Sequence, residues 1–182
     1  GVIKRSNIFE YLKKINQEDR KKLRNLGVKF GRYHVFLFKL FKPSSVSLRI
    51  LLWKIFNNKY LNLSPPTFGL NFLDNMKSSS KDFMLLCGFE NFDDIYVRID
   101  ILERLFLLIF NSEKDDKKEI KVIPEMLNLL GCSKENFKRL LKKMDYKIYE
   151  KDNELFIKYI PTRKHVTKKN DKKDYSNNPF NI

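Results

Sequence analysis

The sequence predicts a mainly α-helical fold with one β-hairpin near its C-terminal end, followed by a disordered basic tail. Three observations predict it. Apolar residues recur at helical spacing through most of the chain, β-branched and aromatic residues flank one short turn, and basic residues dominate the end. Of the 182 residues 42% are apolar, including sixteen Phe, so the chain has enough apolar surface for a core.

The N-terminal third of the chain is expected to be helical. Residues 7–26 predict one or two amphipathic helices that end at Gly27, a residue common at helix C-termini. Residues 28–41 predict a short extended piece followed by a helix. Pro43 ends that stretch, and Ser44 or Ser45 can cap a further helix that runs to about Phe56. Because this helix is apolar on most sides, we expect it at the centre of the core.

The middle of the chain is expected to alternate between loops and helices. Residues 61–80, with two adjacent prolines and three consecutive serines, predict a loop, and a short helix over 81–87 follows. A strongly apolar helix is predicted over 97–110. Within it Asp100 and Arg104 stand four residues apart, so we expect them to form an internal ion pair rather than a catalytic site.

The pattern is clearest in the last third of the chain, after the charged run 112–121, which predicts a solvated loop. Pro124 suits the first turn of a short helix that ends at Gly131. Ser133 is positioned to cap a second helix over 134–144, whose apolar residues fall at i, i+3, i+4 and i+7.

Two runs that favour strands follow, 146–150 and 154–160, and their short connection predicts a hairpin. This order of two helices and a hairpin is that of a winged-helix-like unit. The predicted organisation is therefore a helical accessory domain at 1–95, a winged-helix-like unit at 96–160 and a flexible basic tail at 161–182.

The formal net charge is +15, which attracts polyanions such as nucleic acid. A second explanation stays open, because the chain has no Ala and is rich in Lys, Asn, Ile and Phe. An AT-rich genome gives that composition, so part of the lysine excess reflects codon choice. Charge by itself does not decide between these explanations.

Two regions are candidate nucleic-acid contacts. Residues 29–39 mix cations with aromatic rings, a combination that suits single strands, where rings stack on bases. The helix at 134–144 and the tail carry cations that suit phosphates. The candidate contacts are Lys29, Arg32, Tyr33, His34, Lys134, Lys138, Arg139, Lys142, Lys143, Arg163, Lys164, Lys168 and Lys169. The alternative is that the aromatic residues are core and the lysines only solvate an exposed face.

No motif for chemistry is visible in the sequence. It lacks phosphate-binding glycine loops, the HExxH zinc motif and the GxSxG nucleophile motif. Cys87 and Cys132 lack metal-ligand spacing and are expected to be small apolar residues in a reducing, cytoplasmic setting. We therefore expect no cofactor in this chain, and no apolar stretch is long enough to predict a membrane partner.

Several strings resemble the region that follows the motor domains in alphaproteobacterial superfamily-two, DExH-type RNA helicases, which are similar to the mitochondrial degradosome RNA helicase. The strings that carry the resemblance span most of the chain. They are residues 26–37, 40–43, 48–53, 88–89, 96–105, 124–126, 129–133 and 178–180.

The resemblance implies that the parent protein is an ATP-dependent RNA helicase that uses ATP and Mg²⁺. The nucleotide-binding motifs of that family lie upstream of the matching region, so no residue of this chain is expected to carry ATPase activity. The implied role is an accessory module that binds single-stranded RNA beside the motor domains. Two alternatives stay open: a scaffold that docks a partner such as a ribonuclease, and a stand-alone winged-helix DNA-binding protein.

Overall fold

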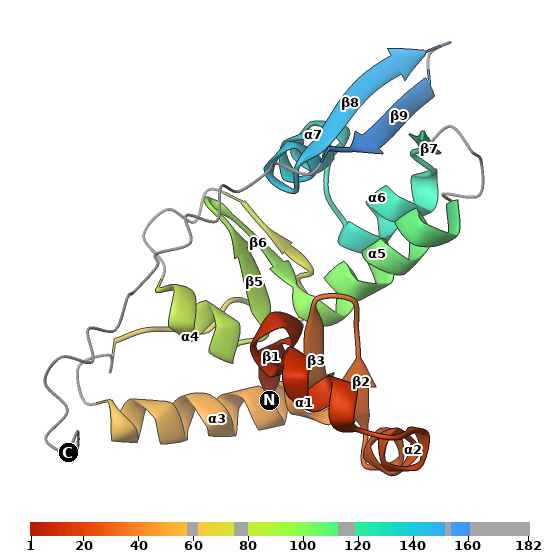
Figure 1. Ribbon diagram of the computed structural model, residues 1–182. Coiled ribbons are helices and arrows are strands. Elements are labelled where there is room, and N and C mark those ends of the chain that lie inside the picture. The colour runs from red at the N-terminus through yellow and green to blue at the C-terminus, as the bar shows by residue number, and fades with distance from the viewer. Residues whose placement is uncertain (58–61, 75–79, 113–118, 152–153, 161–182) are drawn as a thin grey trace, which may run out of the picture.

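The computed structural model describes residues 1–57, 62–74, 80–112, 119–151 and 154–160 (Figure 1). Three small antiparallel sheets, each of three strands, lie among the helices. The prediction of a mainly α fold with one hairpin is therefore wrong, and the fold is mixed α/β. The strands that the sequence did not predict are two to four residues long, too short to show the alternation by which a strand is recognised.

The first sheet is built from residues near the N-terminus. Its elements are β1 (Val2–Lys4), η1 (Arg5–Ile8), α1 (Phe9–Lys14), α2 (Gln17–Asn25), β2 (Val28–Phe30) and β3 (His34–Leu37). The strand order is β1-β3-β2, with Val2 opposite Phe36 and Val28 opposite Leu37. Asn16 caps α2 by accepting a hydrogen bond from the backbone N–H of Asp19.

The second sheet follows two connecting helices. Its elements, in order, are η2 (Phe38–Phe41), α3 (Pro43–Phe56), β4 (Phe72–Leu73), α4 (Lys81–Leu86), β5 (Phe89–Phe92) and β6 (Ile95–Arg98). The strand order is β4-β6-β5. Asp93, at a positive φ of 58°, lies in the turn of the β5–β6 hairpin, so the apolar run before residue 99 is a strand rather than the start of a helix.

The third sheet completes the region in which the sequence predicted a winged-helix-like unit. Its elements are α5 (Ile99–Ser112), β7 (Ile120–Lys121), α6 (Pro124–Leu130), α7 (Lys134–Lys143), β8 (Tyr146–Lys151) and β9 (Glu154–Tyr159). The predicted hairpin is present, and β7 adds a third strand to it in the order β7-β9-β8. The predicted boundary at residues 95–96 coincides with the start of β6.

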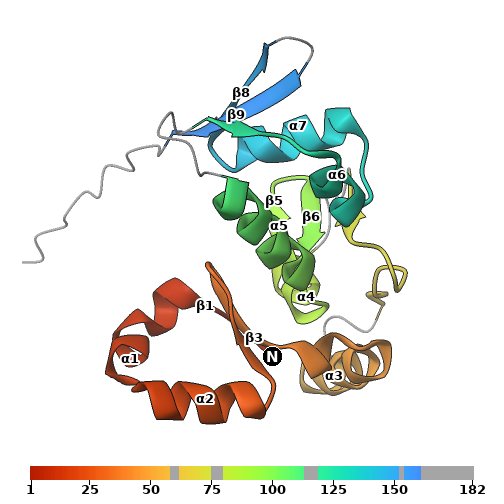
Figure 2. The same ribbon diagram turned by 90° about the vertical axis from the view of Figure 1, so that its right-hand side faces the viewer.

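The same arrangement thus occurs three times along the chain. In each unit a short strand precedes helical structure, a hairpin follows, and the first strand pairs with the last one. The residue between the last helix and the hairpin has a positive φ in every unit, and these residues are Gly27, Gly88 and Asp145. The sequence indicated a winged-helix-like order once, whereas the described part of the chain contains three related units joined by α3 and α5 (Figure 2).

Two apolar clusters hold the units together. The larger one packs α5, α6 and α7 against the second and third sheets and includes Leu102, Leu105 and Phe137. The smaller one packs α3 on α4 and β5 through Val46, Ile50 and Phe83. Helix α3 was predicted to be central, but it is buried on one face only, because α4 and β5 cover that face alone (Figure 1).

Candidate nucleic-acid interface

The carboxylate of Glu103, on α5, joins the first unit to the other two. It accepts hydrogen bonds from the backbone N–H groups of Arg32 (2.5 Å), Tyr33 (3.0 Å) and His34 (2.8 Å), in the β2–β3 connection. Glu103 is only 5% exposed. A buried carboxylate is tolerated when donors surround it, and here three consecutive backbone donors do so. The interaction therefore fixes the hairpin on α5.

The imidazole of His34 lies between two carboxylates. Its Nδ1 is 2.9 Å from Glu103 Oε1 and its Nε2 is 2.9 Å from Glu90 Oε2, and the side chain of Lys4 also contacts Glu90 at 2.9 Å. Burial lowers the pKa of His34, but the hydrogen bonds and charges of Glu103 and Glu90 outweigh it, so the pKa is raised above its usual value. A protonated ring donates from both nitrogens, which matches this geometry.

Gly31 leaves room for the carboxylate at this point. A Cβ atom at Gly31 would lie 2.4 Å from Glu103 Oε2, well inside van der Waals contact. The carboxylate is held by several hydrogen bonds and has little freedom to move aside. In addition, Arg5 Nη1 donates to the Gly31 carbonyl at 3.0 Å, so the turn is held from both sides.

A cleft of about 590 Å³ opens beside this anchor, where all three units meet. Its size lies within the range of about 300–1,000 Å³ typical of ligand sites. Cations and aromatic rings from distant parts of the sequence line it. They are Lys4, Arg5, Phe9, Arg32, Tyr33, Phe92, Phe106, Lys143, Tyr146 and Tyr159.

The rings of the cleft are arranged in two groups. Tyr33 packs on Phe106 with ring centroids 4.4 Å apart, and the guanidinium of Arg32 lies 5.7 Å from the Tyr33 centroid. Tyr146 and Tyr159, opposite each other on β8 and β9, have centroids 5.3 Å apart. Tyr33 and Tyr159 are 42% and 45% exposed, so each group presents a ring to the solvent.

The negative charge of the carboxylates in the cleft is largely balanced by nearby cations. Glu90 is paired with Lys4 and His34, which hold its pKa below the usual value although burial opposes them. Lys143 is paired with Asp93 and Asp94, so it offers little charge to a ligand. Arg32, an exposed side chain, has no carboxylate partner within the described part of the chain. It is the cation best placed to meet a phosphate.

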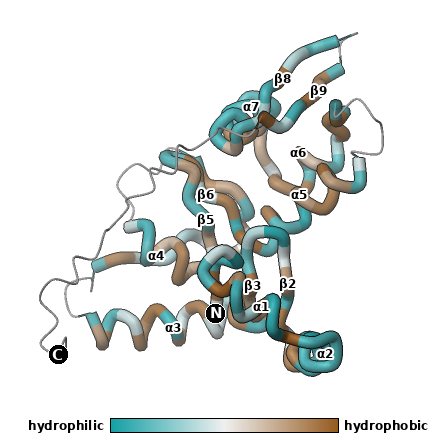
Figure 3. The backbone as a smooth tube through the Cα atoms, viewed as in Figure 1, coloured by the Kyte–Doolittle hydropathy of each residue, from teal (hydrophilic) through white to brown (hydrophobic). Residues whose placement is uncertain are grey.

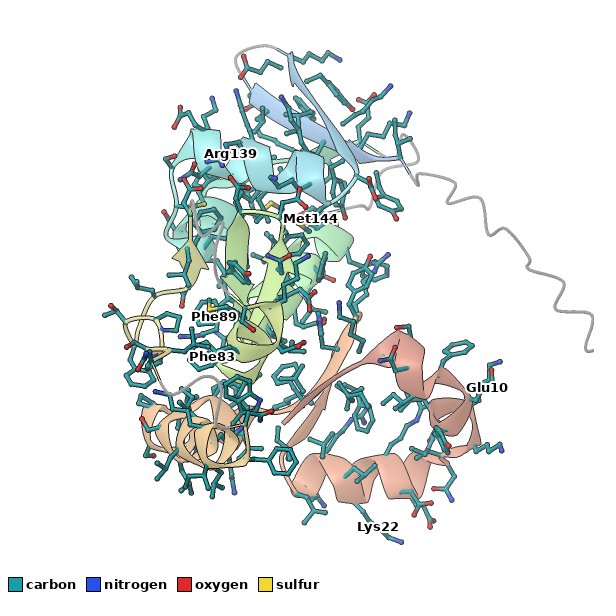
Figure 4. The ribbon with its side chains drawn as sticks, turned by 90° about the vertical axis from the view of Figure 1, so that its left-hand side faces the viewer. Glu10, Lys22, Phe83, Phe89, Arg139 and Met144 are labelled. Atoms are coloured by element: carbon teal, nitrogen blue, oxygen red, sulfur yellow. The ribbon has the colours of Figure 1, made fainter. Side chains whose placement is uncertain are left out.

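Most of the candidate cations of α7 have internal partners. Lys138 contacts Glu150 at 2.6 Å, and Arg139 bridges Asp74 and Asp94 at 2.9 and 2.7 Å (Figure 4). Both aspartates belong to the second unit, so Arg139 holds two units together. Lys134 and Lys142 remain exposed, and no ion pair involves them within the described ranges.

The other candidate nucleic-acid contacts do not all lie at the cleft. Arg32 and Tyr33 line the cleft, whereas His34 touches it with a side chain only 4% exposed and engaged at both nitrogens. Lys29 is exposed on β2, away from the cleft lining. The tail candidates Arg163, Lys164, Lys168 and Lys169 lie outside the described residues.

Sequence reasoning missed Phe9, Phe106, Tyr146 and Tyr159 as cleft residues. From the sequence these residues are expected on apolar helix faces and in the hairpin. Their neighbours in the sequence do not distinguish them from core residues. The opposed pair Tyr146 and Tyr159 carried a signal, because the predicted pairing of runs 146–150 and 154–160 brings the two ends of the hairpin together. The predicted Asp100–Arg104 pair is wrong: Asp100 binds Arg98 at 2.7 and 3.0 Å instead.

Neither a metal-ligand cluster nor a reactive thiol is found among the described residues. No group of three or more His, Cys, Asp or Glu within them is placed to hold a metal ion. Cys87 and Cys132 are free thiols, and burial raises the pKa of each to about 11, which makes them unreactive at neutral pH. No helix in the same residues has the length and apolar character needed to cross a bilayer.

Comparisons of the chain with protein-family models, curated proteins and solved structures give no match. The site must therefore be interpreted from its own geometry: rings and cations around a cleft, held by a buried ion-paired anchor.

Replacing Glu103 by Gln is expected to lower the free energy of unfolding by about 3 kcal/mol, the usual cost of breaking a buried ion pair. Gln keeps only one acceptor oxygen, so its NH2 group must face at least one of the backbone N–H groups that the two carboxylate oxygens of Glu103 now accept. Urea denaturation of both proteins measures the change. Glu154→Gln is the matched control, because its exposed pair with Lys121 contributes at most about 1 kcal/mol. Equal losses in the two variants would contradict the anchoring role.

The raised pKa of His34 predicts that stability depends on pH above neutrality. The stabilisation by protonated His34 is complete below the unfolded pKa of about 6.5 and is lost as the pH rises through the higher folded pKa. The free energy of unfolding should therefore fall as the pH rises above about 6.5. In His34→Gln this fall should be smaller, whereas His165→Gln, which changes the other histidine of the chain, should keep it. Identical pH profiles for all three proteins would refute the prediction.

Proposed function

We propose that this chain is an accessory module that binds single-stranded RNA in the cleft between its three units. The observation that carries the proposal is the combination of exposed rings, Tyr33 and Tyr159, with the exposed cation Arg32 at one opening. Unpaired bases stack on aromatic rings while cations meet the phosphates between them. In a duplex the base faces are already stacked, so a cleft of this kind favours single strands.

From the shape of the cleft, we expect it to bind a short segment of RNA rather than a long one. Its two ring groups come from different units, with Tyr33 on the first and Tyr159 on the third. A strand that crosses the cleft meets both groups in turn. The contact is expected to be tolerant of base sequence, because every base offers a face for stacking.

The wider role that we propose is that of an arm beside the motor domains of an ATP-dependent RNA helicase. The support for this part is the resemblance of the sequence strings to that helicase group. ATP and Mg²⁺ would then act in the motor domains, and this chain would contribute RNA contacts without catalysing a step. The stand-alone DNA-binding alternative receives less support, because Arg139 and Lys143 of α7 have internal partners.

Binding of a fluorescently labelled oligouridine to the full chain, measured by anisotropy at low salt, tests the proposal. The affinity should fall with salt, with a slope of about −1 if one or two cations meet phosphates. Tyr33→Ala combined with Tyr159→Ala should weaken binding at least about thirty-fold, since each of the two stacked bases contributes about 1–3 kcal/mol. Arg32→Gln should weaken binding and make the salt slope shallower.

Matched controls are available on the same unit. Tyr11→Ala and Lys21→Gln change exposed residues of α1 and α2 that lie outside the cleft, so they should leave the affinity unchanged. The absence of binding even at low salt, or an equal loss in the control variants, would exclude the cleft as an RNA site. Tighter binding of a duplex DNA than of the oligouridine would favour the DNA-binding alternative.

A further inference from the structure

Helix α5 exposes three neighbouring residues close to the Glu103 anchor. Arg104, Leu107 and Phe110 follow one another at intervals of three residues, so they are neighbours on the helix surface. All three are exposed, Leu107 at 61% and Phe110 at 58%. Figure 3 shows that α5 is hydrophobic along much of its length and begins beside the β2–β3 hairpin. We call these three residues the α5 platform.

The α5 platform adjoins the cleft through the side chain of Arg32. Its guanidinium lies 5.7 Å from the ring centroid of Tyr33, which lines the cleft, and 5.8 Å from that of Phe110, which does not. Both distances are within the roughly 6 Å at which a cation interacts with a ring. Because a guanidinium is itself planar, Tyr33, Arg32 and Phe110 form a continuous row of planar groups that leads out of the cleft.

The cations of this row are not neutralised by carboxylates of the described residues. The expected pairing of Arg104 with Asp100 is not formed, because Asp100 accepts hydrogen bonds from Arg98 at 2.7 and 3.0 Å. Arg104 is exposed, and no ion pair involves its side chain within the described ranges. The side chain of Arg32 also lacks a carboxylate partner there. A guanidinium presents several N–H donors to a phosphate, so both cations remain able to bind one.

We propose that the single-stranded RNA bound in the cleft continues over the α5 platform, where a base stacks on Phe110 and Arg104 contacts a phosphate. This inference rests on the proposed function and adds to it a contact site outside the cleft lining. Bases of single strands stack on aromatic rings and on guanidinium planes, and both kinds of group lie exposed here. The complete site therefore takes more nucleotides than the cleft alone, and it extends along α5.

A protein partner fits the α5 platform less well than a nucleic acid. Stable protein interfaces bury a broad surface with a largely apolar centre and few charges within it. Leu107 is the only aliphatic residue of the platform, and it lies between a ring and a cation. A polyanion that also carries planar groups matches both the charge and the rings.

Two labelled oligouridines of about four and about twelve nucleotides, lengths that lie within the usual site sizes of single-strand binders, test the proposal. Anisotropy at low salt gives the affinity of the full chain for each. The longer strand binds in more registers, which raises its affinity for every variant, so the informative quantity is the effect of a substitution at each length. Phe110→Ala should weaken binding of the longer strand at least about five-fold and leave that of the shorter strand unchanged, because the cleft holds the shorter strand.

Conservative substitutions separate stacking from simple apolar contact. Phe110→Tyr keeps the ring and should keep the affinity for the longer strand, whereas Phe110→Leu stays apolar without a ring and should lose it as Phe110→Ala does. All three variants should remain folded in thermal unfolding, since the side chain is more than half exposed. Phe56→Ala is the matched control, because that ring is 88% exposed on α3 and its removal should change neither affinity.

Salt dependence tests the phosphate contact of Arg104. For the longer strand, Arg104→Gln should weaken binding and make the salt slope shallower by about 0.7, the value for one phosphate contact on a single strand. For the shorter strand it should change neither quantity. Lys21→Gln removes an exposed cation of α2 and should leave the slope unchanged at both lengths.

The outcomes distinguish this inference from the proposed function. Binding that depends on Tyr33 and Tyr159 but, at both lengths, not on Phe110 or Arg104 would overturn the inference alone. An equal loss at both lengths in Phe110→Ala would mean that Phe110 only positions Arg32, which also overturns it. Failure of the chain to bind either strand would overturn both proposals. A dimer of the free chain that Phe110→Ala dissociates in sedimentation would overturn the inference in favour of a protein contact.

Discussion

The contact between Glu103 and the backbone of residues 32–34 determines how the parts of this molecule are placed. A carboxylate that is 5% exposed is costly unless donors surround it, and three successive N–H groups and the His34 ring satisfy it here. Helix α5 also packs into the core shared by the second and third units. Together with the contacts of Lys4 and His34 to Glu90, this side chain therefore connects the first unit to the rest, and it positions Arg32 and Tyr33 at the cleft.

The three units have the same strand order, but their surfaces serve different purposes. In the third unit, Arg139 and Lys143 of α7 pair with aspartates of the second unit, so the helix that resembles a recognition helix is partly used for internal assembly. The cleft arises where the units meet, and no residue of α3 lines it. The repeated topology is thus a framework, and function depends on what lies between and beside the units.

The helices near the C-terminus were predictable because their signals are local. Pro124, Gly131 and Ser133 mark helix ends, and the apolar spacing over α7 is regular. The short strands β1, β4 and β7 were not predictable, because each is defined by pairing with a distant strand. The turn at Asp93 was missed for a related reason: adjacent aspartates before an apolar run are common at a helix start and in a hairpin turn alike.

The sequence by itself determined the basic character, the helix ends of the last third and the hairpin at β8 and β9, because charge and short-range spacing are local properties. Only the tertiary structure decided which aromatic residues line a cleft and which are core. It also placed His34 between two carboxylates that lie 56 and 69 residues away along the chain. Which side chains are exposed, and which residues pair over such distances in the sequence, depends on how the units pack. The spacing of residues along the chain does not indicate that packing.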